Sequence, residues 1–330
     1  MKYHLVAFLV VAIWGSTFVF TKMLLLAGLT PAQIFTLRFL IAYVLLLGYQ
    51  FILQSFNSST FQFFCSSWRD ELLMVLLGIT GGSVYFLTEN AAMLYTTATN
   101  TSLIVCSCPL FAMLLVALFY RQSEHFTKTQ VFGSVMACIG MAVVVLNGHF
   151  VLHLSPLGDT LAFCACLCWA VYSLLMKVAF ERGQSDACIS SAECEQVRPK
   201  VKPATERYSA LFITRKVFFY GLLTIIPYYL FVPSERWIFT TSIFQIFNPS
   251  ILFNLLFLGV VASMGCYVVW NWVISKLGTV VATNWVYFNP ITTIIFAWWL
   301  LHEQITPWFL MGTVFILTGM YLCDKKRSKI

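Results

Sequence analysis

Three charged side chains lie inside long apolar stretches of the sequence: Lys22, Arg38 and Glu89. A charge within a bilayer costs about 2.5–3.5 kcal/mol on insertion scales, so each of them needs a partner or a function. Counted from the ends of their stretches, all three lie in the same third of a membrane. We expect Glu89 to pair with Arg38 or Lys22. The set would then form a gate or the anion-recognising end of a binding cavity, with a net positive charge that suits a carboxylate.

Each charge also has a purely structural interpretation. Lys22 lies near the end of its stretch, from which a long side chain can extend its ammonium group to the membrane surface. Arg38 and Glu89 can form an ion pair that only stabilises the fold. Glu89 is also the one acid well inside a stretch, which makes it the candidate proton carrier. The sequence leaves these roles open.

Two pairs of polar residues lie in other parts of the apolar stretches. Asn90 and Asn271 each need hydrogen-bond partners, either on a neighbouring helix or in a cavity. Trp14 and Trp169 lie near the centre of their stretches, whereas Trp usually gathers at the membrane surface. Their indole N–H groups need an acceptor, such as a substrate or a carbonyl of a facing helix. Packing of the rings against lipid is the alternative.

Pro109 and Pro290 lie near the middle of two further stretches. Each removes a backbone hydrogen bond inside a helix and frees the carbonyl group of Val105 or Val286. Freed carbonyls are tolerated in a membrane where they line a wet cavity; a kink needed only for packing is the alternative. We expect both stretches to line a pathway, because they are unusually polar and contain Asn100, Thr101, Ser107, Asn284, Asn289, Thr292 and Thr293.

The composition requires that these residues act inside a membrane. Of 330 residues, 60% are hydrophobic and 10% are charged, whereas a soluble domain has about 45–50% apolar and about 25% charged residues. This excludes a disordered chain, a nucleic-acid-binding domain and an ordinary soluble enzyme. No cofactor or metal site is expected, because the sequence has no P-loop, GxSxG or HExxH motif, and His149 and His153 have no acids nearby.

Ten apolar stretches are long enough to cross about 30 Å of hydrocarbon as helices. They cover residues 4–26, 32–53, 72–94, 97–119, 129–147, 157–179, 211–232, 251–275, 279–301 and 307–323. An even number of spans places both termini on one side. Seventeen of the 20 Lys and Arg residues then lie on that side or in the ends of the stretches next to it, Arg236 lies alone on the other, and Lys22 and Arg38 lie in the outer part of their stretches. Because basic loops stay in the cytoplasm, we expect both termini to be cytoplasmic.

The two halves of the sequence repeat the same features. Trp14, Lys22, Asn90 and Pro109 recur in order as Trp169, Lys177, Asn271 and Pro290. We therefore predict an all-α membrane protein of two five-helix repeats, residues 1–150 and 151–330, with a polar cytoplasmic insertion at 184–206. Five is an odd number, so the second repeat is inverted relative to the first. Inverted repeats are typical of alternating-access transporters, whose substrate site lies near the membrane midplane.

Several short motifs resemble the drug/metabolite transporter superfamily, EamA type. They are Trp14-Gly15-Ser16-Thr17, Ala91-Ala92-Met93-Leu94-Tyr95-Thr96-Thr97-Ala98, the Pro109 and Pro290 helices, Gly158-Asp159 and His302-Glu303-Gln304-Ile305-Thr306. The resemblance covers nearly the whole chain except the insertion. It implies a ten-helix carrier of small metabolites, often amino acids or their relatives, usually moved outward. A departure is Arg121-Gln122-Ser123-Glu124, where the family more often has Gly-Glu-Arg.

We therefore expect a secondary transporter, an exporter or a facilitator, in the cell (inner) membrane. Its expected cargo is a small metabolite, above all an amino acid or a related compound. The expected partners are this small-molecule substrate, the lipid bilayer and, as a candidate coupling ion, the proton; no nucleic acid is expected. Small residues at Gly133, Ala137, Gly140, Gly312 and Gly319 predict close helix packing, within one chain or between two, so a monomer and a homodimer both stay open.

Two other cargo classes fit the same fold. An organic-ion or drug exporter would use the many aromatic residues, which can hold cations or stack rings. A nucleotide-sugar or sugar-phosphate exchanger would need basic residues deep in both halves, and those of the second half lie at the cytoplasmic edge. A membrane-embedded enzyme is disfavoured, because the sequence has no catalytic motif.

Overall fold

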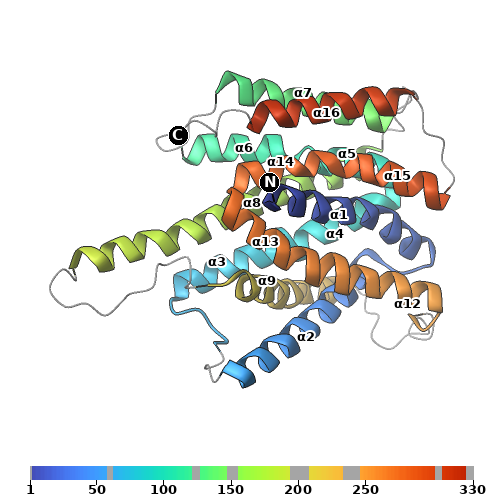
Figure 1. The fold of residues 1–330 in the computed structure, drawn as a ribbon. Helices are drawn as coiled ribbons and strands as arrows, with labels where there is room; N and C mark the ends of the chain where they lie inside the picture. The colour runs from blue at the N-terminus through green and yellow to red at the C-terminus, as the bar shows by residue number, and fades with distance from the viewer. Residues whose placement is uncertain are drawn as a thin grey trace.

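The computed structural model describes residues 2–57, 62–120, 127–146, 155–193, 208–232, 246–301 and 307–324. Regular structure in these residues is entirely helical, and the helices pack in one bundle (Figure 1). The first half contains α1 (Lys2–Leu26), α2 (Pro31–Asn57), α3 (Trp68–Gly78), η1 (Ile79–Ser83), α4 (Val84–Tyr95), α5 (Ala98–Val105), α6 (Cys108–Phe119) and α7 (Lys128–Leu146). The second contains α8 (Pro156–Glu193), α9 (Ala210–Thr224), α10 (Ile226–Phe231), α12 (Pro249–Leu256), η4 (Phe257–Gly265), α13 (Cys266–Leu277), α14 (Thr279–Asn284), η5 (Trp285–Phe288), α15 (Asn289–Leu301) and α16 (Pro307–Asp324).

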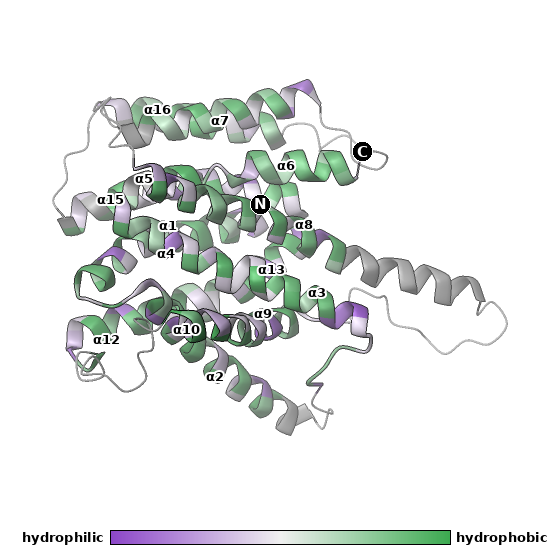
Figure 2. Cartoon of the chain, turned by 180° about the vertical axis from the view of Figure 1, so that it is seen from behind, coloured by the Kyte–Doolittle hydropathy of each residue, from purple (hydrophilic) through white to green (hydrophobic). Residues whose placement is uncertain are grey.

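The helices are long and apolar enough for a membrane. Within the described residues, eight runs of helix could cross a bilayer by length and composition, and two shorter apolar helices cover Lys128–Val143 and Leu310–Cys323. Together they match the ten predicted stretches in order. Large apolar side chains such as Leu5, Leu118 and Leu310 are exposed on the bundle, and hydrophobic residues dominate the helices (Figure 2). Because so much exposed apolar surface is stable only against lipid, the chain is a multi-pass membrane protein.

Three predicted stretches depart from a single regular helix. The stretch at 72–94 contains the π-helical segment η1, and the stretch at 97–119 is interrupted between α5 and α6. Helix α8 continues past the stretch at 157–179 to Glu193, so it includes residues 184–193 of the predicted insertion. No proline stops this helix before Pro199. The rest of the predicted insertion, the motifs at 121–124 and 302–306, and the pair His149 and His153 lie outside the described residues.

Two π-helical segments lie where the two halves meet. Segment η1 packs on α9, and η4 packs on α2. Glycines permit both approaches: a Cβ atom at Gly78 would lie 2.5 Å from the Cβ of Tyr220, and one at Gly259 would lie 2.9 Å from the Cβ of Ile41. The matching positions of the two segments are consistent with the expected duplication. The division into repeats 1–150 and 151–330 stays a prediction.

Helices α7 and α16 form a close pair at one edge of the bundle (Figure 1). Their small residues face each other: a Cβ atom at Gly319 would lie 2.5 Å from the carbonyl oxygen of Gly133 and 2.6 Å from the backbone nitrogen of Ala137. The predicted small-residue stripes therefore serve close packing inside one chain.

This packing gives a prediction with a matched control. Gly319→Ala forces α7 and α16 apart, and we expect it to destabilise the protein by about 1–3 kcal/mol, the usual cost of overpacking. Gly48→Ala places a methyl group where no atom lies within 4 Å, and we expect it to be neutral or stabilising by about 0.5–1 kcal/mol. Thermal unfolding of both variants in detergent measures the difference. Equal midpoints would contradict the described packing.

Candidate functional site

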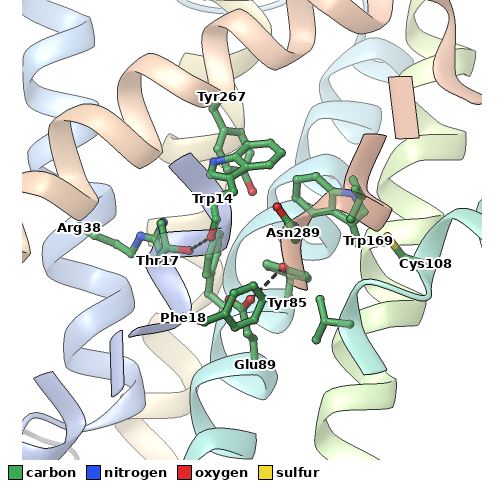
Figure 3. A pocket seen from close by; sticks show the side chains of 13 residues that line it. Trp14, Thr17, Phe18, Arg38, Tyr85, Glu89, Cys108, Trp169, Tyr267 and Asn289 are labelled. Carbon is green, nitrogen blue, oxygen red and sulfur yellow. Dashed lines mark hydrogen bonds between the residues drawn. The ribbon is translucent and has the colours of Figure 1, made fainter. Parts of the chain in front are cut away.

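A cavity in the middle of the bundle is the candidate site (Figure 3). The space between atoms there measures about 440 Å³, part of it open to the surroundings. Both halves of the chain contribute to its wall, which consists of Trp14, Thr17, Phe18, Arg38, Tyr85, Phe86, Glu89, Val105, Cys108, Trp169, Tyr267, Val286 and Asn289.

Aromatic rings make up much of this wall. The ring centroids of Trp14 and Trp169 are 5.4 Å apart with perpendicular planes, and those of Tyr85 and Trp169 are 5.1 Å apart. Tyr267 lies 5.7 Å from Trp14 in an edge-to-face arrangement. Such contacts fix each ring through its neighbours. The result is a preformed cavity with aromatic walls, in which a few polar and charged groups are held in place.

The two tryptophans are buried and do not face lipid, so that interpretation is wrong for both. Trp14 donates its indole N–H to the carbonyl oxygen of Ala262 at 3.0 Å, which is the facing-helix acceptor that the sequence suggested. Trp169 is 5% exposed. Its Nε1 has no hydrogen-bond partner, although the ring lines the cavity. A donor that points into a cavity without a partner is available to a bound molecule.

Arg38 is the cation of the cavity and is 1% exposed. Its Nε donates to Ser263 Oγ at 2.9 Å, and its guanidinium carbon lies 4.3 Å from the centroid of the Phe86 ring. Both partners are uncharged. They hold the guanidinium group at the wall, where Figure 3 shows it beside Thr17.

Glu89 is the acid of the cavity and is 6% exposed. Tyr85, one helical turn earlier in α4, donates its hydroxyl to Glu89 Oε1 at 3.0 Å (Figure 3). Glu89 and Arg38 attract each other electrostatically. The structure nevertheless has no ion pair between them, so the predicted direct pairing is wrong. Ser263, Phe86 and Tyr85 hold the two charges in separate places.

Lys22 lies away from the cavity, and its predicted pairing with Glu89 is also wrong. Its Nζ donates to the carbonyl oxygens of Met93 at 2.6 Å and Thr96 at 3.4 Å. These carbonyls lie at the C-terminal end of helix α4, where the helix dipole favours a cation. Lys22 therefore fixes the end of the helix that presents Glu89.

The paired asparagines join helices. Asn90 donates to the carbonyl oxygen of Pro31 at 3.1 Å. Asn271 donates to Thr214 Oγ1 at 2.9 Å and accepts from Tyr172 at 2.8 Å. Neither amide is among the residues that line the cavity. Of the two interpretations that the sequence left open, helix–helix bonding describes both.

The two proline helices are interrupted at the cavity wall. Helix α5 ends at Val105 and α6 begins at Cys108, with Pro109 in its first turn. Segment η5 likewise precedes α15, which begins at Asn289 followed by Pro290. Val105, Cys108, Val286 and Asn289 line the cavity. The first residues of α6 and α15 therefore lie at the cavity wall.

Other predicted pathway residues lie behind this wall. Pro109 and Pro290 shape the breaks without lining the cavity, and Asn284 is buried beside η5. The side chain of Asn100 lies outside the described residues. The sequence did not single out Phe86, Ser263 or Tyr267, because a ring or a hydroxyl group in an apolar stretch looks like ordinary core. Tyr85 could have been found from its spacing of four residues to Glu89, which places both on one helix face.

The fold and the cavity define a class of protein, the multi-pass helical membrane proteins that enclose a polar cavity at interrupted helices, as secondary transporters do. The chain belongs to the EamA-like transporter family, whose model matches residues 1–146 and 201–323. The resemblance of its motifs to the drug/metabolite transporter superfamily is thereby confirmed, and the protein is a transporter of this type.

Several relatives match most of the chain. A protein described as an uncharacterized transporter from Archaeoglobus fulgidus is 25% identical over 99% of both chains. A probable amino-acid metabolite efflux pump from Salmonella typhimurium is 26% identical over 96% of this chain and 92% of its own. A probable terminal-alkyne amino-acid exporter from Streptantibioticus cattleyicolor is 23% identical over 78% of this chain and 74% of its own. A solved crystal structure has the same fold, with a TM-score of 0.65, 15% identity and 98% coverage of both chains.

The position of Lys22 predicts a structural variant. Lys22→Met leaves the carbonyls of Met93 and Thr96 without their donor, and we expect a loss of stability of about 1.5–3 kcal/mol, typical of a hydrogen bond to a charged group. Thermal unfolding in detergent measures this loss. Ligand affinity of the folded variant should equal that of the wild type. A folded Lys22→Met protein with impaired binding would place Lys22 in the site.

Proposed function

We propose that this transporter exports small metabolites, amino acids or related compounds, through the central cavity by alternating access of two inverted repeats. The observation that carries the proposal is a cavity between the two halves of a membrane bundle, with a buried cation and a buried acid in its wall. The names of the Salmonella and Streptantibioticus relatives support the cargo class. The site of action would be the cell membrane, with both termini in the cytoplasm.

Alternating access requires one end of the cavity to be closed, and the α3–α9 interface supplies a closure. Lys216 in α9 forms an ion pair with Glu71 in the first turn of α3, and Tyr220 donates to the same carboxylate. Further along the same two helices, Gly78 approaches Tyr220 closely, as described above. By the predicted orientation, Glu71 lies at the cytoplasmic end.

The segment before α3 extends this closure. The backbone N–H of Cys65 donates to Glu71 Oε2 at 2.6 Å, and Arg215 donates to the carbonyl oxygen of Gln62. Loading of substrate from the cytoplasm would therefore separate Glu71 from Lys216 and release residues 62–67. Among the described residues this is the one ion pair, so the two ends of the cavity would close by different interactions.

An organic-cation exporter is the second candidate. The observation that favours it is the group of aromatic rings around the single carboxylate of Glu89, since such rings hold cations well. A nucleotide-sugar exchanger has less support, because Arg38 is the one basic residue in the cavity wall. Glu89 is the proposed site if transport is coupled to protons.

Transport by the purified full-length protein in liposomes tests the proposal. We expect saturable movement of neutral amino acids and little movement of lipophilic cations or sugar phosphates. Repeating the assay with an imposed pH gradient tests coupling, and a rate that ignores the gradient would favour a uniporter. Movement of cations alone would replace the proposal with the second candidate.

The closure gives a separate prediction at Cys65. Burial, followed by the hydrogen bond with Glu71, raises the pKa of the Cys65 thiol to about 12, so the thiol reacts slowly while the end is closed. Lys216→Met removes a cation that lowers this pKa. The loss of this charge alone would raise the pKa of the Cys65 thiol further and slow its alkylation. If Lys216 holds the closure, the variant instead exposes the thiol, and alkylation accelerates about tenfold for each unit by which the pKa falls.

Peptide-resolved mass spectrometry after a timed pulse of a membrane-impermeant maleimide measures the alkylation rate of Cys65 separately from the rates of the other cysteines. Arg69→Gln is the matched control, because it removes an exposed positive charge from the same turn of α3 as Glu71. Slower labelling in Lys216→Met would show that the ion pair does not keep this end closed.

A further inference from the structure

The cavity holds two opposite charges that do not meet. Burial of an ionised group is costly unless the group is paired, and Arg38 and Glu89 are both almost completely buried in one cavity wall. Direct contact would relieve the cost, yet their nitrogen and oxygen atoms do not come within ion-pair distance. Each charge is held instead by neutral partners on its own side. The space between them is left to be filled by a molecule that pairs with both.

The free atoms of the wall show which groups such a molecule needs. Among the residues that the structure describes, Arg38 makes one side-chain hydrogen bond, through Nε, and the bond from Tyr85 is the one that Glu89 accepts. Within the described part of the chain, the other guanidinium nitrogens and the second carboxylate oxygen make no hydrogen bond to the protein. Two more buried atoms of the wall lack partners, the donor Trp169 Nε1 and the acceptor Asn289 Oδ1. The cavity thus offers unused donors with a positive charge and unused acceptors with a negative one.

We propose that the cavity recognises the zwitterionic backbone of an α-amino acid, with Arg38 binding its carboxylate and Glu89 binding its ammonium group. This assignment rests on the proposed export function and deepens it to one chemical class. A carboxylate only accepts hydrogen bonds and an ammonium group only donates them, which matches the two sets of unused atoms. Trp169 Nε1 supplies a further donor and Asn289 Oδ1 a further acceptor.

Charge balance favours a zwitterion over a singly charged cargo. Lys22 lies outside the cavity, so the wall has one positive and one negative side chain. An organic cation would pair with Glu89 and leave Arg38 buried without a counterion, and an organic anion would do the reverse. A zwitterion pairs with both and adds no net charge to a low-dielectric enclosure.

The surrounding wall suits both ends of such a ligand. The rings of Trp14, Tyr85 and Trp169 lie in the wall and can attract an ammonium group through their faces. Arg38 provides the positive charge for the carboxylate. Val105 and Val286 line the rest of the wall and leave an apolar surface for the cargo's side chain.

The test compares ligands that differ by one charged group. Full-length protein in lipid nanodiscs is titrated with leucine, with 3-methylbutylamine, which lacks the carboxylate, and with 4-methylpentanoate, which lacks the ammonium group. The same triads built on alanine and phenylalanine cover other side-chain sizes. Quenching of tryptophan fluorescence reports binding, because Trp14 and Trp169 lie in the wall. We expect the amino acid of at least one triad to bind about tenfold or more tightly than both analogues, as for a hydrogen-bonded charge.

Variants assign each charge to its group. Arg38→Gln should abolish the preference for the amino acid over the amine and keep its preference over the acid. Glu89→Gln should abolish the preference for the amino acid over the acid and keep its preference over the amine. Trp169→Phe removes one hydrogen-bond donor and keeps an aromatic ring, so it should weaken the binding of the amino acid and the binding of the acid to the same extent. Arg69→Gln, outside the cavity, is the matched control and should show the wild-type pattern.

Each outcome decides the proposal. Wild-type protein that binds an amine or an acid as tightly as the amino acid in every triad, or that binds none of them, overturns it, even if the variants fail to fold. Unchanged preferences in folded Arg38→Gln and Glu89→Gln overturn the residue assignment while transport of amino acids in liposomes still stands. The predicted binding pattern without any transport would instead contradict the export function and leave the recognition site intact.

Discussion

The separation of two buried charges is the constraint on which the centre of this protein depends. Arg38 and Glu89 share an apolar enclosure in which opposite charges attract strongly, and they would collapse onto each other without other restraints. Ser263 and the Phe86 ring retain the guanidinium group, while Tyr85 retains the carboxylate. The aromatic wall makes these restraints rigid. The cavity exists because the restraints hold.

The backbone around the cavity follows from the same requirement. Both proline helices change their backbone geometry beside the cavity, at the start of α6 and of α15, and glycines let neighbouring helices approach closely there. A Cβ atom at Gly15 would lie 1.7 Å from Thr292 Oγ1 and 2.7 Å from the carbonyl oxygen of Asn289. The first helix therefore supports the irregular turn that presents Asn289. The regular helices α7 and α16, which pack closely through their glycines, lie at the edge of the bundle and do not line the cavity.

The sequence predicts the membrane class, the order of the helices and part of the cavity. Arg38, Glu89, Trp14, Trp169 and Asn289 stand out because polarity is rare in apolar stretches, and all of them line the cavity. Lys22 carries the same signal, but its role depends on where α4 ends in space, which no local pattern encodes. Tyr267 and Ser263 escape notice for the opposite reason, since a lone ring or hydroxyl group is common in apolar helices. Their roles arise from tertiary contacts alone.

The most direct measurement is an experimental structure of the full-length protein with an α-amino acid from the triad that binds best. We expect ligand density in the central cavity, with the carboxylate within hydrogen-bond distance of the Arg38 guanidinium group and the ammonium group within hydrogen-bond distance of Glu89. A direct ion pair between Arg38 and Glu89, with the amino acid bound elsewhere, would contradict it.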